Sequence, residues 1–416
     1  MTTISHEVAV VGAGPAGLAS ALALAHFGLD VAVAAPPPAE GSAAPADPRT
    51  TALLASSLEM LRNLGVWQRC CKHAAALEGV RIVDDRGGLL RAPEVLFRAG
   101  ELGLPAFGAN IANRALGEAL LAAARDAASL VWRPTAGVLE VTPRPACVRL
   151  RLAEGGSLEA RLVVAADGRN SRTRAAAGIP VGTWSYPQAA IATTFRHTRP
   201  HGAVTTELHR RAGPLTTVPL PGLASSLVWV EDPAEARRLA CLPEAPFLAE
   251  LGARLQGLLG ALSEVGPRAL YPLSGLSAHA MGGGRIALVG EAAHVIPPIG
   301  AQGLNLGLRD AAALADCVRE ARAQGADVGG PAVLAAYGRA RAADVLARTL
   351  SVDLLNRSLL LDLLPAQALR GLGLHALANI APLRRLVMQG GLGAIGALPS
   401  LMRPAAASPA HLTSGP

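Results

Sequence analysis

Three glycines close to the amino terminus have the spacing of a phosphate-binding turn. Residues 12–17 form a G-x-G-x-x-G pattern, which follows an apolar strand-like run at Glu7–Val11 and opens an Ala/Leu-rich helical segment. In this context Gly12, Gly14 and Gly17 permit a tight turn and a close approach of the backbone. The helix N-terminus then presents N–H groups to a pyrophosphate. The pattern predicts a dinucleotide site; glycines that serve only helix–strand packing are the alternative.

One part of the dinucleotide fingerprint is absent. An acidic residue about 20 positions farther on normally holds the ribose hydroxyls. Here the second predicted strand, Asp30–Ala34, runs into Ala35 and Pro36, and the nearest carboxylate, Glu40, lies in a Pro/Ala-rich loop. The strand end also has no arginine, which a site for the 2′-phosphate of NADP would need. The sequence therefore leaves the ribose contact unassigned.

A second motif lies at residues 165–174, which read AADGRNSRTR. The apolar strand predicted at Leu162–Ala166 delivers an Asp-Gly turn and then a polar, basic segment. Asp167 would hold a cofactor or organise the loop beside it. An ordinary turn followed by a helix capped by Ser171 is the alternative.

A third motif begins at Gly290 and reads GEAAH, and PPIGAQGLNLGLRD follows from Pro297. The pattern predicts a buried strand that ends in Gly-Glu, a Pro/Gly loop, and a helix that starts near Gly303. Glu291 can accept hydrogen bonds from sugar or ribityl hydroxyls, and the helix N-terminus can stabilise an electron-rich ring. We interpret His294 as a structural residue that holds the loop.

Composition limits the class of protein that carries these motifs. The chain has 416 residues, 51% hydrophobic and 17% charged, which suits two or three structural units with a sizeable core and excludes wholesale disorder. The net charge of +7 comes from scattered arginines, and Lys72 is the single lysine and follows no Gly-rich loop. These features argue against nucleic-acid binding and exclude a P-loop. The five cysteines form no C-x-x-C, which predicts free thiols, a reducing compartment and no metal site.

The segments between the motifs predict the elements that position them. We expect helices at Thr51–Leu64, Asn113–Ala128 and Leu308–Arg322, a hairpin from Leu77–Asp84 and Gly88–Leu90, and helices with interruptions over 332–402. Beyond Pro180 the chain becomes rich in Thr, Val and aromatic residues, which predicts an antiparallel sheet inserted into the α/β unit. Its expected strands are Ala189–Arg196, Val204–His209, Leu215–Leu220 and Ser225–Glu231. The uncharged runs at Val8–Phe27 and Leu386–Met402 are broken by glycines, and neither predicts a membrane span.

The order of the three motifs resembles the FAD-dependent aromatic hydroxylases related to para-hydroxybenzoate hydroxylase. The chain is most similar to the branch that hydroxylates intermediates of ubiquinone biosynthesis, and the resemblance covers residues 5–400. The segments that carry it are Pro298–Asp310, RTTAL from Arg49 ahead of LGVW from Leu64, and Gly213-Pro214 ahead of LVW from Leu227.

The resemblance implies an α/β fold with a Rossmann-like FAD-binding domain, an inserted antiparallel β-sheet substrate domain and a helical C-terminal region. The expected bounds are 1–180 and 281–345 for the FAD-binding domain, 181–280 for the substrate domain, 346–403 for the C-terminal helices and 404–416 for a flexible tail.

The resemblance also implies roles for individual residues. Gly12, Gly14 and Gly17 would face the FAD pyrophosphate, and Arg49 and Arg114 would contact its phosphate and ribose region. Asp167 would lie in a turn that touches FAD and a nicotinamide cofactor. Glu291 replaces the family's usual Asp at the ribityl chain, and Gly303, Leu304 and Asn305 would border the isoalloxazine ring. The chemistry belongs to the flavin, so no catalytic side chain and no metal is expected.

The function implied is hydroxylation of a polyprenylated phenol in ubiquinone biosynthesis through a flavin hydroperoxide, with O2 as co-substrate and NAD(P)H or another electron donor as reductant. The alternatives are a hydroxylase of a soluble aromatic acid and a non-catalytic FAD-binding component of a biosynthetic complex. We expect a cytoplasmic protein, peripheral on the inner face of the cytoplasmic membrane and associated with a ubiquinone-biosynthesis complex. Arg384-Arg385 would then sit on anionic lipid, and a solvated helix face is the alternative.

Overall fold

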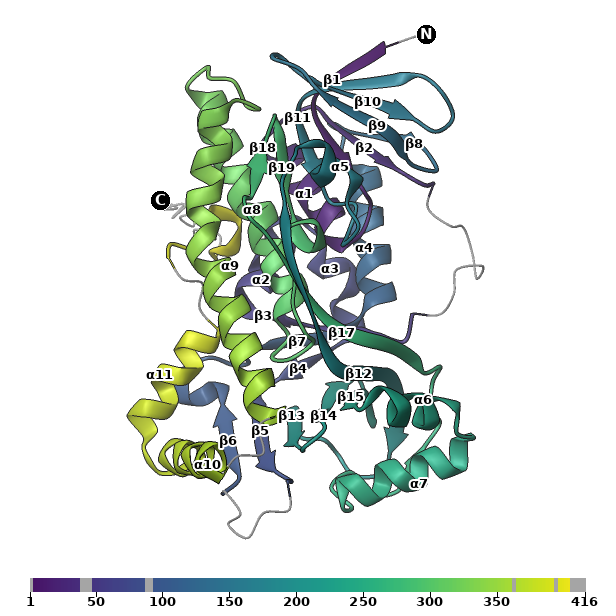
Figure 1. The fold of residues 1–416 in the computed structure, drawn as a ribbon, viewed down its shortest axis with the longest axis vertical. Helices are drawn as coiled ribbons and strands as arrows, with labels where there is room; N and C mark the ends of the chain where they lie inside the picture. Colours follow the sequence, from purple (N-terminus) through teal and green to yellow (C-terminus); the bar gives the residue numbers. More distant parts are fainter. Residues whose placement is uncertain (1–2, 38–46, 87–92, 361–363, 393–395, 405–416) are drawn as a thin grey trace, which may run out of the picture.

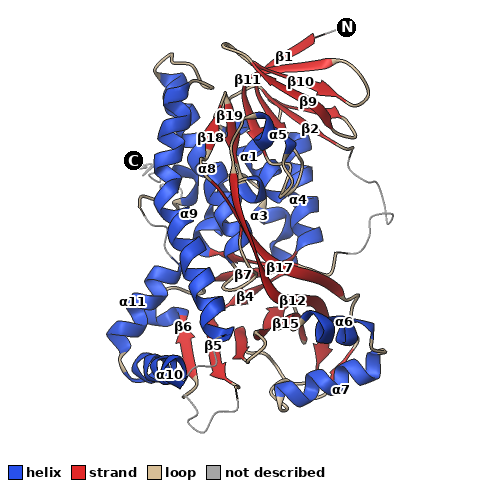
Figure 2. Cartoon of the chain, viewed as in Figure 1, coloured by secondary structure: helices blue, strands red, loops and turns tan. Residues whose placement is uncertain are grey.

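A computed structural model describes residues 3–37, 47–86, 93–360, 364–392 and 396–404 (Figure 1). Glu40, the strand predicted at Gly88–Leu90 and the tail from residue 405 onward lie outside these ranges. The described chain forms two large sheets and a small one, and helix α9 runs along one side of the molecule (Figures 1 and 2).

The first sheet is parallel at its centre, where β19, β11, β1, β2 and β8 lie side by side in that order. Residues 8–11 of β1 and all of β2 are buried, as expected for strands that are covered on both faces. The strands are β1 (Thr3–Val11), β2 (Val31–Ala35), β8 (Leu130–Pro134), β9 (Val138–Pro143), β10 (Val148–Leu152), β11 (Ser157–Ala165), β18 (Gly282–Gly283) and β19 (Ile286–Leu288).

Helix α1 is central to this layer and packs between α4 and α8. It is apolar all round, and every residue from Gly17 to Leu24 is buried. Glycine permits the close approach of α8, because a Cβ on Gly307 would lie 3.3 Å from the Cβ of Ala16. The helices of this part are α1 (Pro15–His26), α2 (Ala55–Asn63), α3 (Trp67–Cys70), α4 (Asn113–Asp126), α5 (Arg172–Ala176) and α8 (Gln302–Ala323).

The second large sheet confirms the predicted antiparallel insertion, and its core is the pairing of β12 with β15 and β17. Helices α6 (Pro233–Cys241) and α7 (Glu244–Leu255), which the sequence did not predict, cover one face through Ile191, Trp229 and Phe247. The strands are β5 (Gly79–Asp84), β6 (Val95–Arg98), β12 (Val181–His197), β13 (Val204–His209), β14 (Pro214–Leu220), β15 (Ala224–Glu231), β16 (Leu262–Ser263), β17 (Ala269–Ala278) and β20 (His294–Val295). The sheet thus also takes β5 and β6 from outside the range 181–280.

The C-terminal helices α9 (Pro331–Leu360), α10 (Leu364–Asn379) and α11 (Ala381–Leu392) confirm the helical prediction for this region. Figure 1 shows α10 and α11 beside β5 and β6, at the end of α9. They pack there through a cluster that includes Phe97, Leu374 and Met388. No described helix combines the length and the apolar character needed to cross a bilayer.

One local prediction was wrong. The helix expected over Thr51–Leu64 is β3 (Thr50–Leu54) followed by α2, because β3 pairs with β7 (Gly108–Ala112) in a small sheet that β4 (Ala74–Leu77) completes. The β-branched Thr50 and Thr51 suit this strand, but the partner that stabilises it is remote in sequence. Within the described residues, the antiparallel partner of β5 is β6.

Candidate cofactor-binding site

The three motifs meet at the carboxyl-terminal edge of the parallel sheet. Strands β1, β11 and β19 are neighbours, and Val11, Ala165 and Leu288 lie in register at their ends. Gly12, the Asp167 turn and Glu291 therefore emerge side by side. Ligands of open α/β sheets bind beyond the carboxyl ends of the strands, and this edge has that geometry.

The glycine turn is so tight that two of its glycines admit no side chain. Gly12 has φ +106°, and a Cβ there would lie 2.4 Å from the carbonyl oxygen of Ala166. A Cβ on Gly17 would lie 2.2 Å from the carbonyl oxygen of Gly12. Gly14 differs, because it is exposed and no atom lies within 4 Å of the position of a Cβ. The turn therefore leaves open space at Gly14, directly at the N-terminus of α1, where N–H groups and a partial positive charge attract an anion.

The carboxylate of Asp167 organises its own loop. It accepts hydrogen bonds from the backbone N–H of Thr173 at 3.1 Å, from the Thr173 hydroxyl at 3.0 Å and from the hydroxyl of Ser171. The Ser171 hydroxyl in turn accepts from the N–H of Arg174 and caps α5, as the alternative interpretation of this motif predicted. Asp167 thus holds the turn in place.

Arg174 joins the second motif to the third, and sequence reasoning missed it. Its side chain is buried and donates to the carbonyl of Ala292 at 2.8 Å and to the carbonyl of Arg169 at 3.0 Å. The signal that the sequence offered for this residue was its place in the arginine-rich run 169–174. The contact fixes the turn that carries Glu291 against the Asp167 loop.

Glu291 projects from the end of β19 into solvent. Within the described residues its carboxylate makes no hydrogen bond, so it is available to hydroxyl donors of a bound molecule. Arg49 lies near enough for the two charges to interact. The pKa of Arg49 is raised, first by its hydrogen bond to Asp47, and the charges of Tyr271 and Glu291 add to this effect. The guanidinium of Arg49 lies 5.3 Å from the centre of the Tyr271 ring.

The N-terminus of α8 forms the other side of the site. Gly303 is exposed, with no atom within 4 Å of the position of a Cβ, and Leu304 is half-buried. Asn305 is buried, and its side chain accepts from the N–H of Leu54 at 2.9 Å and donates to the carbonyl of Ala52 at 2.8 Å. Asn305 therefore fixes the helix end to β3, and the groups presented outward are the backbone and Gly303.

Asp310, which sequence reasoning did not single out, lies beneath this turn. Its carboxylate is fully buried, accepts from the N–H of Gly290 at 3.0 Å and from Arg341 at 2.7 Å, and lies 2.6 Å from Nε2 of His294. Burial by itself would raise the pKa of Asp310, but the charges of His294 and Arg341 and their hydrogen bonds outweigh it and lower the pKa to about 2. Asp310 thus holds the start of the turn that carries Glu291.

Two further side chains, Arg114 and Trp229, make contacts of their own. Arg114, on the first turn of α4, is 64% exposed and pairs with Glu118 at 2.8 Å. Trp229 is fully buried against Phe247 and belongs to the core rather than to a pocket. The described end of β2 supplies no carboxylate for a ribose. Among the described residues, no three His, Cys, Asp or Glu side chains gather as metal ligands.

Comparison with known proteins decides which dinucleotide this edge accepts. The family model described as the FAD binding domain matches residues 5–349, which is most of the chain. The chain belongs to this FAD-binding family.

The residues of this FAD-binding protein fit the cofactor. The open space at Gly14 and the N-terminus of α1 suit the pyrophosphate, the free carboxylate of Glu291 suits the ribityl hydroxyls, and the bare backbone at Gly303 suits the edge of a flat ring. The contacts with FAD of all the residues named for them remain predictions: Gly12, Gly14, Gly17, Arg49, Arg114, Asp167, Glu291, Gly303, Leu304 and Asn305.

The relatives of this FAD-binding protein include hydroxylases over nearly its whole length. It is 35% identical over 397 residues to the ubiquinone hydroxylase UbiL of Rhodospirillum rubrum, covering 94% of this chain and 90% of the relative. It is 33% identical over 399 residues to the 3-demethoxyubiquinol 3-hydroxylase of Escherichia coli, covering 94% of this chain and 100% of the relative. Among solved structures, p-nitrophenol 4-monooxygenase PnpA from Pseudomonas putida has the same fold, with a TM-score of 0.76, 22% identity, and coverage of 95% and 100% of the two chains.

Proposed function

We propose that this protein is an FAD-dependent monooxygenase that hydroxylates the aromatic ring of a polyprenylated phenol in ubiquinone biosynthesis. The observation that carries the proposal is the meeting of the glycine turn, the Asp167 loop and Glu291 at one sheet edge. The relatives named as ubiquinone-pathway hydroxylases support the substrate class. NAD(P)H or another electron donor supplies the electrons and O2 the oxygen atom.

Bound FAD supplies the activation of O2, and the protein supplies position and a dry environment. The N–H groups at Gly14 and the start of α1 bind the pyrophosphate. Glu291 accepts from the ribityl hydroxyls, and the α8 N-terminus at Gly303 stabilises negative charge on the ring. Arg174 and Asp310 hold the Glu291 turn, so that these groups need not reorganise when the cofactor binds.

The substrate ring lies, in this proposal, on the face of the second sheet opposite to α6 and α7. This face lies toward the FAD-binding part of the chain, because the hydroxyl of Ser226 on it accepts a hydrogen bond from the hydroxyl of Thr50 on β3, at 2.8 Å. Val230, Ala190 and Leu273 form an apolar cluster on the second sheet, separate from the cluster that packs on α6 and α7. Apolar side chains there exclude water from the reacting ring.

The protein docks, in this proposal, on the membrane that dissolves its prenylated substrate. Helix α11 has an outward apolar side, which we call the α11 face, made of Leu383, Leu386 and Val387, exposed to 37%, 65% and 46%. Arg385 is exposed beside it, whereas Arg384 is held by Glu101 on the opposite side. Apolar side chains with an adjacent arginine suit an anionic lipid surface.

A quinone-lipid profile by mass spectrometry of cells that lack the gene tests the proposal. We expect a prenylated phenol that lacks one hydroxyl to accumulate, and wild-type protein but not the Glu291→Ala variant to restore the pathway. An unchanged quinone pool in the deletion strain would overturn the pathway assignment. Oxidation of NAD(P)H stimulated by a soluble phenolic acid would then favour the hydroxylase of soluble acids.

The non-catalytic alternative predicts a different pattern. Complementation by both Glu291→Ala and Gly303→Trp variants, with normal product, would show that the protein serves a biosynthetic complex without using its flavin. FAD content of the purified variants provides the control, because it shows whether the substitutions emptied the site.

A further inference from the structure

One row of side chains on α9 changes from small to large along the helix. Gly338, Ala342, Leu346, Leu350 and Leu354 follow one another at intervals of four and therefore form a single ridge, which we call the α9 ridge. Its three leucines are exposed to 59%, 50% and 65%. Solvent-facing sides of helices normally carry charged residues. Between residues 331 and 358, however, the exposed charged side chains are two arginines, at 339 and 357.

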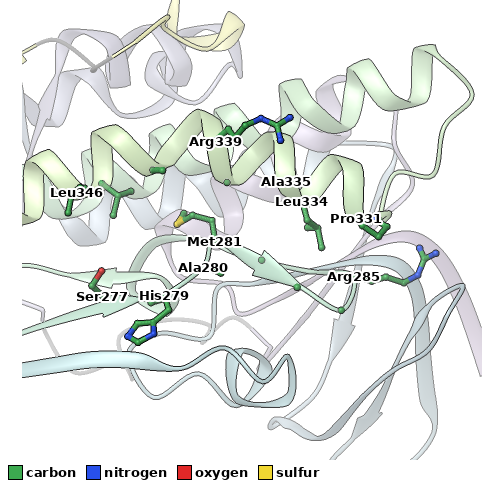
Figure 3. Close-up of a pocket in the computed structure, with 18 of the residues that line it drawn as sticks. Ser277, His279, Ala280, Met281, Arg285, Pro331, Leu334, Ala335, Arg339 and Leu346 are labelled. Atoms are coloured by element: carbon green, nitrogen blue, oxygen red, sulfur yellow. The ribbon is translucent and has the colours of Figure 1, made fainter.

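A hollow lies beside the thin end of the α9 ridge. A groove of about 810 Å³ separates the first half of α9 from the segment 277–285 (Figure 3). Figure 3 shows Met281 and Leu334 pointing into this space, with Leu346 at one end of it. Three consecutive glycines, at 282–284, supply part of the wall and keep it free of side chains. The α9 groove is lined mainly by apolar side chains and glycines, with Arg144, His279, Arg285 and Arg339 also on its wall, and it lies where the ridge consists of Gly338 and Ala342.

We infer that α9 forms an isologous contact with α9 of a second copy of this chain, with the two-fold axis at Leu346. Antiparallel pairing about this residue places Leu350 opposite the partner copy's position 342 and Leu354 opposite its position 338. Each leucine therefore meets the Ala or Gly that leaves room for it, and the leucines of each copy enter the groove of the other. A two-fold interface must be self-complementary, and this size gradient supplies that property. Packing of i, i+4 ridges is also the commonest class of helix contact.

The charged residues of α9 support the same antiparallel register of the two helices. Arg339 makes no ion pair within the described part of the chain, and this pairing places it opposite Asp353 of the other copy. Asp353 accepts from Tyr186 at 2.6 Å and from Arg357 at 2.8 Å, and its two oxygens have room for a further donor. A lipid surface would offer Arg339 no opposing carboxylate.

Mixing two variants of the full, FAD-loaded protein tests the inference. Leu350→Glu/Leu354→Glu removes the ridge, and Gly338→Trp fills the groove. Each variant alone loses both contacts of the dimer, so we expect sedimentation to show monomers at concentrations where the wild type is dimeric. A mixture retains one intact contact, ridge of one variant in groove of the other, and should form heterodimers. The matched control is Leu386→Glu on the α11 face, which should leave the dimer unchanged.

An engineered disulfide across the two-fold axis tests the register in which the two α9 helices pair. In a parent protein with Cys71→Ser and Cys241→Ser, we expect Leu346→Cys to cross-link to its own copy under mild oxidation and Ala335→Cys not to. A monomeric wild type, or a dimer that persists in both the ridge and the groove variants, would overturn the inference. So would loss of binding to lipid vesicles in the ridge variant with no change in sedimentation. FAD content and melting temperature confirm that each variant is folded.

Discussion

The carboxylate of Asp310 lies 2.6 Å from Nε2 of His294, and both side chains are buried. Asp310 belongs to helix α8, whereas His294 follows the turn that carries Glu291. The same carboxylate accepts a hydrogen bond from the backbone N–H of Gly290, so Asp310 contacts the turn at its first residue, Gly290, and at its end, His294. The position of Glu291, the carboxylate proposed to bind the cofactor, is therefore set by a residue that is itself buried.

Replacement of Asp310 by Asn should destabilise the protein by about 3–5 kcal/mol, because it removes one of the two buried carboxylates that pair with Arg341, the other being Asp344. The pKa of Asp310 is lowered in the folded protein. Its contribution to the stability of the fold is therefore fully present above about pH 4, which is the pKa of an aspartate in the unfolded chain. It is lost as the pH falls toward 2. Denaturant unfolding should show a constant difference between wild type and variant at pH 5–8 that narrows below pH 4. The exposed Asp126→Asn is the control, and a difference that grows on acidification would contradict this account.

Gly12→Ala and Gly14→Ala should separate folding from cofactor binding. The first forces a side chain at φ +106° against the carbonyl of Ala166 and should cost at least about 1–3 kcal/mol of unfolding free energy. The second occupies open space and should leave the stability of the FAD-free protein within about 0.5 kcal/mol. It should weaken FAD binding, because the added methyl group takes room needed by the pyrophosphate. Melting curves and flavin titrations measure the two effects, and equal melting temperatures would refute the distinction.

Glu291→Ala should weaken FAD binding by about 1.5–3 kcal/mol, roughly 10- to 100-fold in Kd, since a charged acceptor is lost. Glu291→Asp restores the family's usual residue and should bind within a few-fold of wild type. Flavin fluorescence quenching reports both values. Neither change should alter the melting temperature of the FAD-free protein, because the side chain is exposed. Glu118→Ala, another exposed carboxylate, is the control.

Leu386→Glu/Val387→Glu should reduce flotation with phosphatidylglycerol vesicles by at least about tenfold, since burial of each such side chain contributes about 1.5–3 kcal/mol. Both residues lie on the α11 face and are exposed, so the fold should persist. Leu139→Glu, at an exposed leucine on β9, should float like the wild type. Equal loss in both variants would count against a specific docking face.

Alkylation at pH 8 should divide the cysteines into two classes. Burial raises the pKa of Cys70 and of Cys317 to about 11, and the neighbouring Cys71 adds to the shift at Cys70. Because the thiolate is the reactive form, these two should react roughly a hundredfold more slowly than the exposed Cys71 and Cys241. Mass spectrometry of timed samples measures the rates, and unfolding should abolish the difference.

The sequence alone predicted the sheet edge at which we expect the cofactor to bind, because each of the three motifs is a local unit of strand, turn and helix. Gly12, Asp167 and Glu291 could each be placed at a strand end from neighbouring residues, and parallel strands bring their carboxyl ends to one edge. The glycine pattern at 12–17 also specified a tight turn, in which Gly12 and Gly17 leave no room for a side chain.

Only the tertiary structure decided which side chains hold that edge together. Asp310 meets Arg341 across 31 positions, and Asn305 meets Leu54 across 251. Local propensity carries no information about such partners, which is also why β3 was predicted as a helix. The same holds for the outward side of α9. The sequence gives the order of small and large residues from Gly338 to Leu354, but only the packing of the fold leaves these residues exposed. Burial and pairing are properties of the whole fold, and they assigned these residues their roles.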